Sequence, residues 1–387
     1  MRAVFRLALI SAYVAIVATS AAAQPAVKTV TMKGQDGIKL VGTYYAAAQP
    51  GPALLLLHQC YRDRSSWSKF AEAAAARGYH VLTLDYRGYG ESEGEQFEDF
   101  ARQAPIQREK WPGDVDAAFA FLTSATGVDK NRIGAAGASC GVNQAAQLAR
   151  RHPEVRTLVL LSGGIEPDAR EYIRNTGAMP ILTAGSLDDG NIVSTMRWIT
   201  GWSRNPASRF VEYKAAGHGT EMFAVEAGLQ PSMLDWFDAH LKAASSTLPA
   251  PTGTAGAKTA LDEFWSAIAS PNGIAKARAI YDDTRKKDRS ILLFPESELN
   301  LFGYQVLQAG RAKDAIAIFQ MNVDEYPTSA NTYDSLSDAY LEDGNTAEAL
   351  RLAEKAIQAL ASDKSTPEDF KQRIRESAEA KIAKLKK

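Results

Sequence analysis

A serine, an acidic residue and a histidine follow one another along this chain in contexts that suit nucleophilic catalysis. They are Ser139 in "GASCG", Asp188 or Asp189 in "GSLDD", and His218 in "GHGT". A serine hydroxyl is a weak nucleophile until a neighbouring imidazole accepts its proton, and the imidazole needs a carboxylate to fix its tautomer and stabilise its charge. The three residue types therefore predict a triad in which the serine attacks a carbonyl carbon.

The sequence around Ser139 predicts a sharp turn from a strand into a helix. The apolar stretch "IGAAGA" precedes the serine, and "CGVNQAAQLARR" follows it with helical periodicity. In the pattern G-x-S-x-G, glycines such as Gly137 and Gly141 let the chain turn tightly while the serine projects its hydroxyl. This context favours a nucleophile over an ordinary turn.

The first 242 residues alternate short apolar strands with amphipathic helices. This alternation predicts an α/β fold with a doubly wound, mostly parallel sheet. In such a sheet, functional residues gather at the carboxyl ends of the strands, which is where Ser139, the two aspartates and His218 fall. Buried strands are expected at 53–58, 80–85, 131–137, 156–162, 180–185 and 208–214, preceded by an antiparallel edge near 27–33 and 39–46.

The N-terminal region resembles the α/β-hydrolase superfamily, particularly its dienelactone hydrolase-like and prolyl-peptidase-like branches. The resemblance rests on "LLLLHQCYRDRSSW", "LDYRGYGES", "GASCG", "GSLDD" and "GHGT". It implies that Ser139 is the nucleophile, Asp188 the orienting acid and His218 the general base and acid. Asp188 is preferred because family members usually place the acid three residues after a glycine, here Gly185. Asp189 is the alternative.

The loop after the first buried strand departs from the family pattern. Many members have a glycine after the histidine, whereas here His58 is followed by Gln59 and Cys60. The resemblance makes His58 a structural residue beneath the oxyanion loop and not a catalyst. Dienelactone hydrolases themselves have a cysteine at the centre of the nucleophile turn, where this chain has Ser139 with Cys140 one residue later.

Cys60 and Cys140 are the two cysteines of the sequence. The family fold implies that their backbone N–H groups form the oxyanion hole, because one donor follows the nucleophile and the other comes from the loop after a strand. Two amides that reach one oxygen bring their α-carbons near the separation that a disulfide accepts. The sequence therefore allows a disulfide between Cys60 and Cys140, with two reduced cysteines lining the pocket as the alternative.

The N-terminus has the features of a secretory signal peptide. Two arginines precede an apolar run, too short for a membrane span, that ends in small residues. We expect cleavage after Ala23 and a periplasmic or secreted protein without a membrane anchor. The 44 basic and 45 acidic residues of the chain leave no broad basic surface, so nucleic acid is not an expected partner.

A stretch of small residues at 243–258, "AASSTLPAPTGTAGAK", separates two regions of the chain. We expect a signal peptide at 1–23, an α/β-hydrolase domain at 24–246, a linker at 247–258 and an all-α helical domain at 259–387. Within the last domain Gly310 aligns with Gly344 and Ala315 with Ala349, a period of about 34 residues. This period resembles tetratricopeptide repeats, which commonly bind peptides or proteins.

Taken together, these features predict an exported serine hydrolase that cleaves an ester, lactone or related acyl bond of a small substrate. One alternative is a peptidase of the prolyl-peptidase-like branch. Another is a protein-interaction module with a secondary hydrolase domain, and a third is that the repeats cover the active-site face. No metal and no other cofactor is expected. Phe97, Phe100 and Trp111 are candidates for a pocket wall or for anchors of a surface loop.

Overall fold

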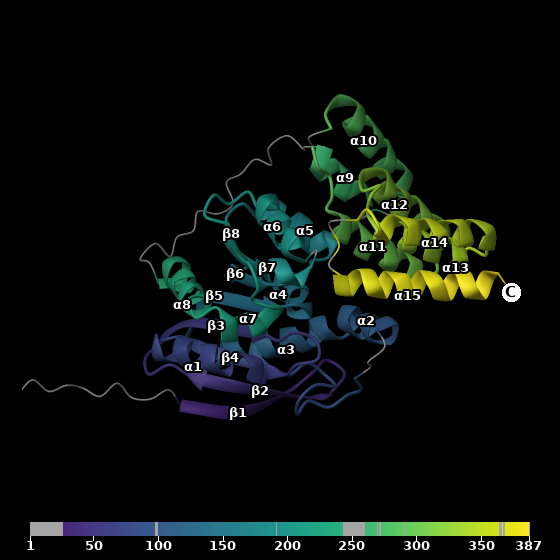
Figure 1. Cartoon of the computed structure of the whole chain (residues 1–387). Helices are drawn as coiled ribbons and strands as arrows, with labels where there is room; N and C mark the ends of the chain where they lie inside the picture. The colour runs from purple at the N-terminus through teal and green to yellow at the C-terminus, as the bar shows by residue number, and fades with distance from the viewer. Residues whose placement is uncertain are drawn as a thin grey trace, which may run out of the picture.

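The computed structural model shows a sheet domain followed by a helical domain (Figure 1). It describes residues 26–96, 100–190, 192–242, 260–268, 270, 272–289, 291–363, 366 and 368–386. The predicted signal peptide, the predicted linker and Phe97 lie outside these ranges, as does the side chain of Phe100.

Within the described residues, eight strands form one sheet with the order β1-β2-β4-β3-β5-β6-β7-β8. Strands β1, β2 and β4 pair antiparallel, and the remaining pairs are parallel. The predicted α/β sheet with an antiparallel edge is therefore confirmed. The strands are β1 (Ala26–Lys33), β2 (Lys39–Ala46), β3 (Gly51–Leu57), β4 (His80–Leu84), β5 (Val128–Ala138), β6 (Val155–Leu161), β7 (Ile181–Ser186) and β8 (Arg209–Tyr213).

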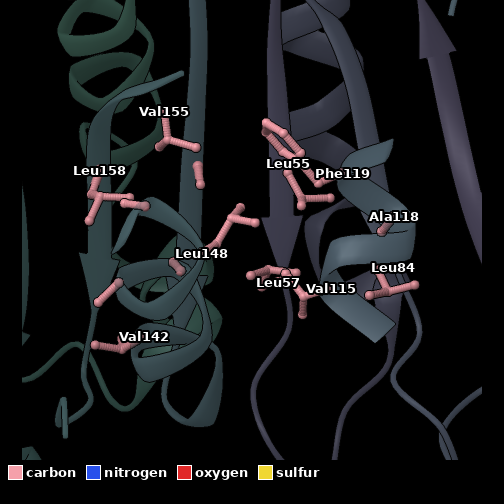
Figure 2. Packing of buried hydrophobic residues seen from close by; sticks show 14 of the residues in the cluster. Leu55, Leu57, Leu84, Val115, Ala118, Phe119, Val142, Leu148, Val155 and Leu158 are labelled. Atoms are coloured by element: carbon pink, nitrogen blue, oxygen red, sulfur yellow. The ribbon is translucent and has the colours of Figure 1, made fainter. Parts of the chain in front are cut away.

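Both faces of the sheet are covered by helices. Strand β3 is buried along its whole length, as its unbroken apolar sequence requires. Because side chains alternate along a strand, Leu57 packs with Val115 on one face (Figure 2), while Leu56 packs with Phe70 on the other. The helices of this domain are α1 (Ser68–Ala76), α2 (Phe100–Glu109), α3 (Trp111–Ser124), α4 (Cys140–Arg151), α5 (Pro167–Thr176), α6 (Ile192–Trp202), α7 (Met222–Val225) and α8 (Leu229–Phe237).

Trp111 belongs to the core and not to a pocket wall. Its side chain is fully buried at the start of α3, and its ring stacks on Tyr86 with 3.8 Å between the centroids. Of the two predicted roles for Trp111, the structure shows the anchor, because the ring fixes the segment that leads into α3.

The described secondary structure of the C-terminal region consists of helices, and successive helices pack side by side from α11 to α15 (Figure 1). A Cβ at Gly303 would lie 2.4 Å from the Phe319 ring, so a glycine permits the close approach of α11 and α12. This arrangement is compatible with a helical repeat, and the tetratricopeptide assignment stays a prediction. The helices are α9 (Ala260–Ile268), α10 (Ile274–Lys287), α11 (Glu296–Gln308), α12 (Ala312–Glu325), α13 (Ala330–Glu342), α14 (Thr346–Leu360) and α15 (Glu368–Leu385).

An apolar interface joins the helical domain to α5 and α6. Trp202 of α6 is buried in one cluster with Trp265 of α9 and Leu299 of α11. The Trp198 ring lies 5.1 Å from that of Trp202 and 5.5 Å from that of Trp265, measured between centroids. The two domains therefore share a hydrophobic core at this boundary.

A buried ion pair crosses the same boundary. Arg170 of α5 donates to Glu298 of α11, and both side chains are 2% exposed. The Arg170 guanidinium also donates to the Ile165 carbonyl at 2.8 Å and lies 4.5 Å from the Trp198 ring and 4.0 Å from the Trp265 ring. Burial raises the pKa of the Glu298 carboxyl, and the Arg170 charge opposes that rise. A charge without its partner at this depth is strongly unfavourable, so the pair fixes α11 against α5.

Candidate active site

Ser139 occupies a strained turn between β5 and α4. Its φ of 51° and ψ of −116° lie outside the regions that residues with a side chain normally adopt. A Cβ at Gly137 would lie 2.0 Å from the Gly141 carbonyl oxygen, and one at Gly141 would lie 2.3 Å from the Leu57 carbonyl oxygen. Only glycine fits at either position, and the turn has the strand, elbow and helix geometry that the sequence predicted.

His218 pairs with Asp189. Its Nδ1 lies 2.9 Å from Oδ1 and 2.8 Å from Oδ2 of Asp189, whose side chain is mostly buried. Asp188 is directed elsewhere: it accepts hydrogen bonds from the Ser186 hydroxyl and from the Gly217 N–H. The preference for Asp188 over Asp189 as the partner of His218 is therefore wrong.

The reason for this correction is the conformation of the loop after β7. Residues Leu187–Asp189 form one turn of 3₁₀-helix, in which successive side chains point about a third of a turn apart. Only one of the two neighbouring aspartates can then face His218. The Ser186 hydroxyl, which donates to Asp188, also accepts the Ala216 N–H at 2.8 Å, so Asp188 holds the loop that carries the histidine.

The surroundings of His218 act on its pKa in opposite directions. Burial lowers the pKa, but the hydrogen bond and charge of Asp189, together with the charge of Glu221, outweigh it and raise the pKa above the usual value for histidine. The imidazolium form is therefore stabilised at the position where a general base gains its proton.

This shift predicts a pH dependence. Below its pKa the His218 ring carries a proton and cannot accept one from Ser139, so kcat/KM should rise with pH through a midpoint above 6.5. In Asp189→Asn the two largest causes of the increase are removed, and the pKa should fall. An NMR titration of the His218 ring measures this directly. Glu221→Gln is the matched control and should lower the pKa by less, and an equal or larger fall in that variant would contradict the assignment.

His58 lies beneath the loop after β3 as a buried structural residue. Its Nδ1 lies 2.7 Å from the Gln59 carbonyl oxygen, and its Nε2 lies 3.3 Å from the Tyr86 nitrogen. A ring protonated only at Nδ1 donates to the first and accepts from the second. Burial lowers the pKa of His58 to about 4, so the ring is neutral near pH 7. The resemblance to the α/β-hydrolase superfamily implied this structural role for His58.

Gln59 links this loop to the loop of His218. Its side-chain oxygen accepts hydrogen bonds from the Thr220 N–H at 2.8 Å and from the Thr220 hydroxyl at 2.9 Å. A Cβ at Gly219 would lie 2.3 Å from the same oxygen. The sequence showed that Gln59 replaces a common glycine, but not that its side chain holds the segment after the histidine.

A disulfide joins Cys60 to Cys140, with 5.7 Å between the α-carbons. Of the two states that the sequence allowed, the structure shows the bonded one. The Cys60 N–H is directed at the Cys140 Sγ, 3.0 Å from the nitrogen. Cys140 begins α4, so its N–H has no acceptor within the helix. The Cys60 N–H, one of the two predicted oxyanion-hole donors, is thus directed at this sulfur, whereas the Cys140 N–H, the other predicted donor, has no acceptor within the helix.

Ser139 and His218 line one cavity of about 340 Å³. Part of its wall is the loop after β6, where Ser162 has a φ of 51° and a Cβ at Gly163 would lie 2.3 Å from the Ser139 carbonyl oxygen. Leu301 of α11, in the helical domain, also lines the cavity. This contact agrees with the alternative that the repeats cover the active-site face, although the sequence pattern did not single out Leu301.

The described residues hold no group of three or more His, Cys, Asp or Glu side chains arranged to bind a metal ion. None of the helices they form has the length and apolar character needed to cross a membrane.

Comparison with known proteins relates the sheet domain to a known family. Residues 52–188 match the sequence profile described as alpha/beta hydrolase fold. The N-terminal domain has the α/β hydrolase fold. Within this hydrolase domain, 140 residues are 34% identical to an uncharacterized protein of Mycobacterium tuberculosis, covering 36% of this chain and 46% of that protein. A further match, 34% over 139 residues, is a thiohydrolase of Aspergillus aculeatus, covering 35% of this chain and 41% of that protein. The chain thus spans less than half the length of these curated relatives.

Solved structures with a similar chain fold include an esterase, Pf2001, of Pyrococcus furiosus. It aligns with a TM-score of 0.46 and 17% identity over 56% of this chain and 92% of its own. A dienelactone hydrolase-like promiscuous phosphotriesterase, P91, from metagenomic libraries aligns with a TM-score of 0.45 and 17% identity over 56% of this chain and 99% of its own.

Proposed function

We propose that this hydrolase is an exported serine enzyme that cleaves an ester or related acyl bond of a small substrate. Ser139 is the nucleophile, His218 the general base and acid, and Asp189 the orienting carboxylate. The observation that carries the proposal is that a strained serine turn shares a cavity with a histidine whose far nitrogen is paired with a carboxylate. These are the parts that serine-dependent acyl transfer needs.

The proposed reaction has two halves. As the Ser139 oxygen attacks the substrate carbonyl carbon, its proton passes to Nε2 of His218, and Asp189 stabilises the imidazolium through Nδ1. The Cys140 N–H supports the negative charge that develops on the carbonyl oxygen. The C–O bond to the leaving group then breaks, and His218 returns the proton to that group. Water repeats the sequence on the acyl-enzyme and releases the acid.

Three observations support this substrate class and location. A cavity of about 340 Å³ is near the lower limit for ligand pockets, which favours a small acyl compound over the peptide alternative. The similarity to a thiohydrolase supports hydrolysis of an acyl bond. The disulfide between Cys60 and Cys140 supports export, because such bonds persist in oxidising compartments.

The proposal is tested by labelling the native protein with a fluorophosphonate while it hydrolyses p-nitrophenyl acetate. The expected result is that ester cleavage falls in proportion to a single adduct, and that mass spectrometry of digested protein places this adduct on Ser139. Hydrolysis that continues after Ser139 is fully labelled would show that another group performs the reaction. Heat-denatured protein is the control and should take up no label.

A further inference from the structure

The hydrolase domain has no large lid of its own between β6 and β7. Only residues 162–180 separate the end of β6 at Leu161 from the start of β7 at Ile181, and α5 takes up ten of them. A lid inserted at this point would otherwise shape the substrate cavity. The wall on this side of Ser139 must therefore come from another part of the chain.

Helix α11 of the helical domain supplies part of that wall. Leu301 and Gln305 both line the cavity that contains Ser139 and His218. They are four residues apart, so they lie on one face of the helix. A Cβ at Gly164 would meet the Leu301 side chain at 3.5 Å, which places Leu301 in contact distance of the loop that follows β6.

The position of α11 is fixed by its contacts with the hydrolase domain. Three residues before Leu301, Glu298 forms the buried ion pair with Arg170 of the hydrolase domain. One residue earlier, the Ser297 hydroxyl lies 2.7 Å from that of Thr195 on α6. Leu299 is buried in the core that the two domains share. Three consecutive residues thus hold the first turn of α11 against α5 and α6, and Leu301 lies two residues after them.

Helix α11 lines two neighbouring cavities. A second cavity of about 660 Å³ lies between the domains. It shares a polar set of lining residues with the first: Gln107, Arg108, Asn143, Gln144, Glu166 and Gln305. On the side of Ser139 the lining includes apolar Ile165, Ile192 and Leu301. An aliphatic chain bound next to Ser139 would therefore meet apolar side chains first.

We propose that α11 is the specificity wall of this hydrolase, and that Leu301 sets the length of aliphatic chain accepted beside Ser139. The inference rests on the proposed function and adds a substrate class to it: acyl compounds with a flexible aliphatic chain that lies against Leu301 and Ile192. The helical domain then performs the task that an inserted lid performs in other hydrolases. This contact of the helical domain with the active site does not require the repeats to bind peptides.

The test compares Leu301→Trp and Leu301→Ala with the native protein on two substrate series: p-nitrophenyl esters from acetate to decanoate, and acetate esters of alcohols of increasing length. Leu301→Trp should lower kcat/KM for long chains about tenfold or more in one of the series and change the shortest member little, because added bulk excludes methylenes. Leu301→Ala should shift the preference towards longer chains. Equal changes for all members of both series would overturn the inference.

Leu292→Trp is the matched control. Leu292 belongs to the same domain and is 44% exposed, against 37% for Leu301, but it lines neither of the two cavities. The chain-length profile of this variant should equal that of the native protein, and a shift like that of Leu301→Trp would also overturn the inference. If Leu301→Trp fails to fold, Leu301→Ala carries the test, because shortening a partly exposed side chain leaves the core intact.

Ser139→Ala, measured with the same two substrate series, distinguishes a failure of the proposed function from a failure of the proposed role of α11. Ester cleavage that persists in Ser139→Ala contradicts the proposed function. Cleavage that depends on Ser139 but keeps its profile in both Leu301 variants contradicts only the role of α11. Alkyl fluorophosphonates of short and long chain give a second readout, since they require a reactive Ser139 and no turnover. Their relative labelling rates should change in Leu301→Trp as the ester preferences do.

Discussion

Ser139→Ala is expected to lower kcat for ester hydrolysis about a million-fold, to the residual rate that binding and the oxyanion hole alone provide. The reason is that the rest of the site acts through the Ser139 oxygen: His218 has no proton to accept without it, and Asp189 then stabilises a charge that never forms. The measurement is p-nitrophenyl ester turnover by purified protein, with circular dichroism to show that the fold is unchanged.

Ser162→Ala is the informative comparison for this variant. Ser162 also ends a strand with a positive φ and lines the same cavity, but its hydroxyl is fully buried. We expect a loss of activity far smaller than that of Ser139→Ala. A loss confined to Ser162→Ala would show that the wrong strand end has been assigned. Full activity in Ser139→Ala would instead show that a group other than Ser139 is the nucleophile.

Asp189→Asn is expected to lower kcat about 10⁴-fold. An asparagine side chain can donate a hydrogen bond to Nδ1 of His218, which favours the tautomer with its hydrogen on Nε2 and removes the acceptor that Ser139 needs. The charge that stabilises the imidazolium is lost as well. Steady-state kinetics over several pH values would separate these effects, because raising the pH cannot restore a ring held in the wrong tautomer.

Asp188→Asn is the matched control, since it makes the same change one residue earlier. Asp188 binds Ser186 and Gly217 instead of the histidine, so its loss should loosen the loop and lower kcat by about tenfold at most. The opposite ranking, with Asp188→Asn the more damaging variant, would show that the pairing of His218 differs in solution.

The sheet and the nucleophile turn could be predicted because both depend on local patterns. Apolar runs bounded by turn residues locate the strands within a few positions, and the glycines at 137 and 141 stand next to the serine whose turn they permit. The acid could not be located to the residue. Asp188 and Asp189 are identical in type and adjacent, and a single turn of 3₁₀-helix decides which one faces His218.

The wall of the cavity was beyond sequence reasoning for a different reason. Leu301 and Gln305 lie on a helix of another domain, and their contact with the site depends on how the two domains dock. That docking rests on Arg170 and Glu298, which in a sequence are typical of exposed positions. Coverage of the active-site face by the repeats was one of the alternatives that the sequence left open, but the residues that provide it could not be read from the sequence. Trp111, a candidate for the wall, packs in the core instead.

The buried pair between Arg170 and Glu298 has a consequence for biosynthesis. Because the chain is made from its N-terminus, Arg170, Trp198 and Trp202 are complete before α9 and α11 exist to cover them. During that interval the hydrolase domain exposes an apolar surface that surrounds the charged Arg170 side chain. Such a surface is prone to aggregation. The helical domain thus covers an aggregation-prone surface of the hydrolase domain. A chain that ends before residue 260 should therefore aggregate rather than form a smaller enzyme.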